Sequence, residues 1–71
     1  MKHSLRVNEQ IDVPEVMVID ANKKIHKAVQ IADAIQMAKI LGLDLLEINP
    51  GANPPVCKIV DLEEYFARRP R

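Results

Sequence analysis

The stretch IADAIQMAKILGLDLLEI, residues 31–48, changes from a helical to an extended pattern of apolar residues within one segment. Apolar side chains recur at helical spacing through its first part, at Ile31, Ala34, Ile35, Ala38 and Leu41. Asp33 in the first turn and Lys39 in the last turn both suit the helix dipole. Gly42 is placed to end the helix in the left-handed conformation. The spacing therefore predicts a helix over residues 31–41.

The same stretch continues as a strand over residues 43–48. Strand alternation puts Leu46 and Ile48 on one face and Leu45 and Glu47 on the other. A helix between strands predicts a right-handed crossover and at least one parallel pair of strands.

The residues before this stretch predict a hairpin preceded by an arm. Within residues 15–20, the side chains of residues 16–19 are apolar on both faces, which is typical of a central strand. Residues 20–23 have turn chemistry, and residues 24–29 predict a return strand with Ile25 and Val29 packed inward. Residues 1–13 carry no sustained period and are polar at their start, so we predict a flexible arm unless a partner or the domain holds it.

The residues after the stretch predict a stiff loop, a fourth strand and a second helix. Three prolines restrict the backbone of residues 49–55. Residues 56–60 alternate, with Cys57 and Ile59 on one face and Lys58 on the other, between Val56 and Val60. Residues 62–69 predict a helix that packs through Leu62, Tyr65 and Phe66 and stops at Pro70. The fold class is α/β (α+β), a small mixed four-stranded sheet with one main helix on one face and a short C-terminal helix.

The length and the net charge of the chain limit the classes of function that it can have. A chain of 71 residues forms one small domain of marginal stability, for which a surface function is a better hypothesis than a deep active site. Ten basic and ten acidic residues cancel, so any RNA contact must be local. The basic residues cluster at Lys23, Lys24 and Lys27 and at Arg68, Arg69 and Arg71. We expect a cytoplasmic protein, because no apolar run is long enough for a membrane span or a signal peptide. We also expect a monomer.

The single cysteine does not predict catalysis. A nucleophilic Cys57 would need a neighbouring base, and the candidates are only His3, which lies in the arm, and His26. A lone cysteine in an alternating strand is far more often a packed, reduced thiol. Without Cys or His partners at ligand spacing the chain does not predict a metal site, and we predict neither a cofactor nor an enzyme.

Lys58 has two interpretations. One helix covers one face of a four-stranded sheet, so the other face presents apolar stems and this cation, which suits an RNA backbone or an acidic protein patch. In the structural alternative, Lys58 pairs with Glu47 across the sheet.

Several strings together resemble the N-terminal domain of bacterial translation initiation factor 3. They are RVNEQI at residues 6–11, PEVMVID at 14–20, LGLDLLEI at 41–48 and PPVCKIVD at 54–61. The resemblance covers nearly the whole chain, and the first and last strings are specific when they occur together at this distance.

The resemblance implies a non-enzymatic factor that binds the small ribosomal subunit, through its RNA and protein, and initiator tRNA. It implies a part in start codon selection and in keeping the subunits apart, beside a C-terminal domain joined by a basic linker that begins at residues 62–71. Arg6, Asn8 and Lys58 are the binding residues that it implies, to which we add Arg68 and Arg69 as predicted phosphate contacts.

Two departures from the family pattern leave alternatives open. The turn after Asp20 lacks the usual glycine and carries Lys23, Lys24 and Lys27 instead, and the long lysine-rich linker does not follow. The chain is then either an excised domain or a shortened relative. The alternative function is a protein-interaction module, derived from the family, that no longer acts on the ribosome.

Overall fold

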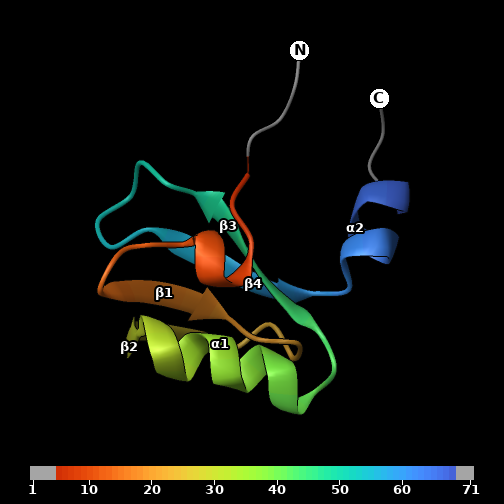
Figure 1. The fold of residues 1–71 in the computed structure, drawn as a ribbon, viewed down its shortest axis with the longest axis horizontal. Coiled ribbons are helices and arrows are strands. Elements are labelled where there is room, and N and C mark those ends of the chain that lie inside the picture. The colour runs from red at the N-terminus through yellow and green to blue at the C-terminus, as the bar shows by residue number, and fades with distance from the viewer. Residues whose placement is uncertain (1–4, 69–71) are drawn as a thin grey trace.

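The strands form one mixed sheet in the order β2-β1-β4-β3 (Figure 1). The computed structural model describes residues 5–68. Its strands are β1 (Glu15–Ile19), β2 (Ile25–Gln30), β3 (Asp44–Asn49) and β4 (Val56–Val60). β1 pairs with β2 antiparallel and with β4 parallel, and β3 pairs with β4 antiparallel. The predictions of a central first strand and of a parallel pair are both confirmed.

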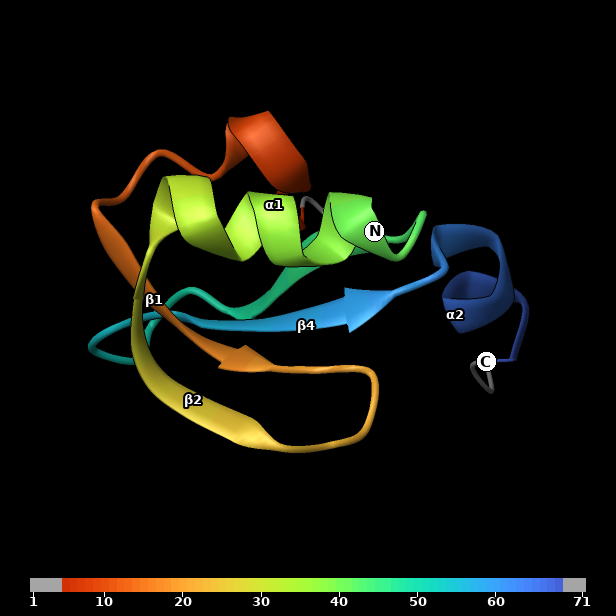
Figure 2. The same cartoon turned by 90° about the horizontal axis from the view of Figure 1, so that it is seen from below.

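Helix α1 (Ile31–Ile40) follows β2 directly and lies across one face of the sheet (Figure 2). Ala34 and Ala38 are fully buried on its inner side, where their small side chains let the helix approach the strands closely. The helix ends as predicted at Gly42, whose φ is +71°. Leu41 was expected in the buried stripe, but it is 54% exposed because it lies just beyond the last helical residue.

The hydrophobic core lies between α1 and the sheet. It is built mainly from Val16, Val18, Leu45, Cys57 and Ile59, which point from β1, β3 and β4 toward the helix. The predicted inward positions of Cys57 and Ile59 are thus confirmed. The opposite face of the sheet, which we call the open face, has no helix lying across it in Figure 2.

Ile25 is a correction to the sequence prediction. It was expected to pack inward together with Val29, but it is 58% exposed. Val29 pairs with Val16 and packs on the core, whereas Ile25 pairs with Ile19, which is one position beyond the inward Val18 and therefore lies on the opposite face. A register shift between Val16 and Val18 adds one residue to β2 and turns Ile25 to the open face.

Helix α2 (Leu62–Arg68) follows β4 and lies beyond the end of the sheet (Figure 1). Its Tyr65 is half-buried and meets Phe66 edge to face, with ring centroids 5.2 Å apart. Phe66 was expected to pack inward but is 47% exposed. Adjacent residues of a helix point about 100° apart, so a short helix that contacts the sheet on one side buries only one of the two rings.

Candidate functional site

The segment before β1 lies along the outer edge of β3. Val7 forms an isolated antiparallel bridge with Leu46, and the Glu47 amide donates to the Arg6 carbonyl at 2.9 Å. A 3-10 helix, η1 (Asn8–Gln10), then turns the chain toward the α1 side of the sheet (Figure 2). The edge of β3 is therefore covered by residues that precede it by about forty positions in sequence.

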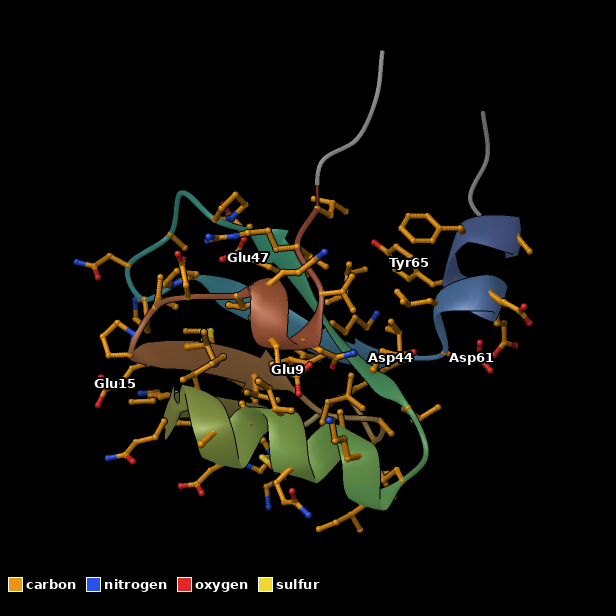
Figure 3. The ribbon with its side chains drawn as sticks, viewed as in Figure 1. Glu9, Glu15, Asp44, Glu47, Asp61 and Tyr65 are labelled. Carbon is orange, nitrogen blue, oxygen red and sulfur yellow. The ribbon has the colours of Figure 1, made fainter. Side chains whose placement is uncertain are left out.

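Arg6 donates two parallel hydrogen bonds to the buried carboxylate of Glu47. Its Nε donates to Oε1 and its Nη2 donates to Oε2, both at 2.9 Å, while Nη1 donates to Asp12 at 2.6 Å. Glu47 is 2% exposed and points toward this segment in Figure 3. The hydrogen bond with Glu47 is the main reason that the pKa of the Arg6 guanidinium is raised, and the hydrogen bond with Asp12 adds to this effect. A buried carboxylate needs such a partner, so Arg6 has a structural task.

Asn8 attaches the same segment to the domain two residues further along the chain. Its Oδ1 accepts the Leu45 amide and its Nδ2 donates to Asp44, both at 2.9 Å. Its backbone is left-handed, with φ at +51°, a conformation that asparagine tolerates better than most residues. The described part of the predicted arm, residues 5–13, is thus bonded to the domain, and its mobility in solution stays a prediction.

Lys58 lies on the open face. It pairs across the sheet with Leu46 of β3 and Ile19 of β1, whereas Glu47 pairs with Cys57 on the α1 side. The structural alternative, in which Lys58 pairs with Glu47, is therefore wrong, since the two side chains leave opposite faces and Arg6 holds the carboxylate. Within residues 5–68 the Lys58 ammonium has neither a hydrogen bond nor an ion pair.

The turn between β1 and β2 is organised by the carboxylate of Asp20. One oxygen accepts the amides of Asn22 and Lys24, and the other lies 2.9 Å from Nε2 of His26. The hydrogen bond with His26 is the main reason that the pKa of Asp20 is lowered. Lys23 takes the left-handed conformation, with φ at +68°, a conformation that glycine adopts most readily.

The remaining predicted residues divide between two places. Lys23, Lys24 and Lys27 are exposed on the β1–β2 turn and on β2. Arg68 is the last residue of α2, while Arg69, Arg71 and His3 lie outside the described residues. β1 and β4 run parallel, so the turn after β1 and helix α2 after β4 lie at the same end of the sheet (Figure 2).

Cys57 is inert in this arrangement. It is fully buried, and burial followed by the Glu47 charge raises the pKa of its thiol to about 12. The prediction of a packed core thiol is confirmed. Between residues 5 and 68 no group of His, Cys, Asp and Glu side chains is arranged to hold a metal ion. In the same part of the chain no helix has the length and apolar character to cross a membrane.

Sequence reasoning missed the role of Glu47 and of Asp20. Glu47 was assigned to Lys58, and nothing in the local sequence connects it to Arg6, 41 residues away. Asp20 was recognised only as turn chemistry, although an aspartate followed closely by asparagine is a known signal for side-chain to backbone hydrogen bonds.

Comparisons with known proteins agree on one family. The family model for the translation initiation factor IF-3 N-terminal domain matches residues 7–68. The translation initiation factor IF-3 of Brucella anthropi is 56% identical over 61 residues, covering 86% of this chain and 34% of that protein. The factor of a Caulobacter species is 46% identical over 65 residues, covering 92% and 38%. That of Rickettsia typhi is 45% identical over 60 residues, covering 84% and 32%. The chain spans about a third of the length of these relatives.

Proposed function

Because this chain belongs to the translation initiation factor IF-3 family, whose N-terminal domain it matches, we propose that it binds the small ribosomal subunit. Binding there would contribute to the selection of initiator tRNA at the start codon and to keeping the subunits apart. The relatives are about three times as long, so these activities belong to a larger protein in their case. We propose that this chain acts as a monomer and without catalysis.

Lys58 carries the proposal. It is a cation without a partner among residues 5–68, on a face of the sheet that no helix lies across, and it is surrounded by apolar side chains. Such a residue needs no rearrangement of the domain before it meets a phosphate or a carboxylate. We propose that Lys58 contacts the subunit directly and that Arg68 and Arg69 add phosphate contacts.

Arg6 and Asn8 have a different part in the proposal. Their side chains already hold Glu47, Asp44 and the Leu45 amide, so they act by keeping the N-terminal segment on β3. The side chain of Arg6 is 36% exposed, so part of it stays accessible to a ribosomal group.

The test compares two lysines in the 71-residue chain. Lys58→Ala should weaken co-sedimentation with purified small subunits and lower the salt slope of binding by about one unit. Its free energy of unfolding should stay within about 0.5 kcal/mol of the parent value. The control is Lys39→Ala, because Lys39 lies on α1 and pairs with Glu9 at 2.9 Å.

Three results would contradict the proposal or part of it. If the folded chain does not co-sediment at low salt, it does not act on the subunit, and the protein-interaction module becomes the better interpretation. If Lys58→Ala and Lys39→Ala bind equally well, the subunit does not touch the open face at Lys58. Loss of stability with unchanged affinity would likewise remove Lys58 from the binding residues.

A further inference from the structure

The basic side chains of the described residues are divided between two sides of the molecule. Arg6 and Lys39 are paired with carboxylates, on the N-terminal segment and on α1. The side chains of four lysines, Lys23, Lys24, Lys27 and Lys58, have neither a hydrogen bond nor an ion pair within residues 5–68. All four belong to the hairpin of β1 and β2 or to the neighbouring strand β4.

The strand register joins the hairpin to Lys58. Ile19 pairs with Lys58 on one side and with Ile25 on the other, so these residues form one row across three strands. Two strand spacings separate Lys58 from Ile25, roughly 10 Å. Lys24 directly precedes Ile25. This separation is close to the Debye length of about 8 Å at physiological salt, so the potentials of these lysines overlap.

The hairpin contains two acidic residues, Glu15 at its start and Asp20 in the turn beside the lysines. One carboxylate oxygen of Asp20 accepts two backbone amides, and the other pairs with His26. The same contacts fix the turn, so that Lys23 and Lys24 are held out in solvent on a defined loop.

We propose that Lys23, Lys24 and Lys27 form, with Lys58, a surface that binds the sugar-phosphate backbone of RNA. Phosphate contacts require point charges on flexible stems, and these lysines provide them. These lysines fit a protein partner less well than RNA, because protein interfaces are depleted in lysine and gain their affinity from Trp, Tyr and Arg anchors. The hairpin contains none of these three residue types.

This inference rests on the proposed function, and it assigns RNA as the partner at the hairpin. Lys23 takes the left-handed conformation at some conformational cost, which fits a position where the charge of the side chain is used.

A tethered probe tests the inference directly. Cys57 is buried and the pKa of its thiol is raised to about 12, so we expect one new exposed cysteine to be labelled selectively. Lys24→Cys carries an iron chelate that generates hydroxyl radicals, and the control is the same probe on Lys39→Cys. Both are bound to small subunits, and cleavage of the ribosomal RNA is mapped. We expect cleavage from position 24 that position 39 does not produce.

A charge variant gives the energetic readout. Replacing Lys23, Lys24 and Lys27 together by glutamine should lower the salt slope of subunit binding by about two to three units, while Lys39→Gln leaves it unchanged. Circular dichroism should show the triple variant folded, since all three side chains are exposed.

The outcomes separate the two proposals. A complex that forms without RNA cleavage from position 24 would overturn the hairpin inference and leave subunit binding intact. Crosslinking of position 24 to ribosomal protein alone would also overturn it, in favour of an acidic protein patch. If the chain labelled at position 24 does not bind the subunit although the chain labelled at position 39 does, the probe lies within the interface, and an unchanged salt slope of the triple variant would then overturn the inference. If the unlabelled chain itself does not bind, the proposed function fails and the inference fails with it.

Discussion

Gly42 and Gly51 occupy loops that make different demands on a side chain. Gly42 ends α1 with φ at +71°, and a Cβ there would meet nothing within 4 Å. Any cost of a side chain at Gly42 is therefore conformational. Gly51 has no positive φ, and its Cβ would meet only Oδ1 of Asn49 at 3.6 Å, an ordinary contact.

Alanine at the two glycines should therefore have opposite effects. Gly42→Ala should destabilise the domain by about 1 kcal/mol, because an L-residue is strained in the left-handed region. Gly51→Ala should be neutral or stabilising by up to about 1 kcal/mol, because it restricts the unfolded chain. Urea denaturation of both variants measures the difference. Equal free energies of unfolding would show that the αL turn is not needed to end α1.

Asp20 predicts a dependence of stability on pH. Its pKa is lowered from the ordinary value of 3.8, first by His26 and then by the Lys24 amide. A carboxylate whose folded pKa is depressed stabilises the fold above its unfolded pKa, and this stabilisation is lost as pH falls through the folded value.

Asp20→Asn is the matched variant, because the amide oxygen still accepts the turn amides while the charge is gone. We expect the parent to have the higher melting temperature at pH 6, and the two proteins to converge as pH falls below about 4. Thermal unfolding by circular dichroism between pH 2 and 6 measures this. A constant gap over the whole range would mean that the charge of Asp20 does not support the turn.

At the scale of elements, the N-terminal segment acts as a short fifth strand on β3. It supplies the carbonyl that accepts the Glu47 amide and the side-chain oxygen that accepts the Leu45 amide. It also supplies the guanidinium that neutralises Glu47. Covering the outer edge in this way removes a row of unpaired backbone groups that could pair with another chain.

Removal of Arg6 should detach this segment. Arg6→Met leaves the Glu47 carboxylate buried without its cation, so we expect the melting temperature to fall by roughly 10 °C. Hydrogen exchange should show the amides of Leu45 and Glu47 losing protection together. The double variant Arg6→Met/Glu47→Met should recover most of the lost stability, because neither buried charge remains. Unprotected Leu45 and Glu47 amides in the parent protein would contradict the attachment.

At the scale of the whole molecule, the rate at which the Cys57 thiol reacts measures how often the core opens. It lies in β4 under α1 and is buried on all sides, so a reagent reaches its thiol only when the domain opens. Its raised pKa, about 12, further suppresses the thiolate.

Iodoacetamide should therefore react with native Cys57 at least about 100-fold more slowly than with the unfolded chain. The rate should rise with urea in parallel with global unfolding. The control is Ala32→Cys on the exposed side of α1, which should react at the rate of a free thiol. Fast modification of native Cys57 would show a local opening of β4 and would make a reactive thiol worth considering again.

The amino-acid sequence by itself determined the elements. The change of apolar period at Gly42 predicts α1 and β3, and the alternation of residues 56–60 predicts β4 with Cys57 and Ile59 inside. These patterns are local, because each depends on the faces of a single helix or strand. The motifs that carry the family resemblance were readable in the same way.

Only the tertiary structure decided which faces and partners meet. The register shift in the β1–β2 pair turned Ile25 outward, and one added residue of this kind leaves no mark on the apolar pattern. The sequence offered only Lys58 as a partner for Glu47, and the strand register placed Glu47 on the α1 side, where Arg6 holds it. The folded sheet brings together side chains that are 41 residues apart, and local sequence patterns do not predict such a contact. Arg6 and Asn8 hold the N-terminal segment on β3, their part in binding stays a prediction, and Lys58 has no partner among the described residues.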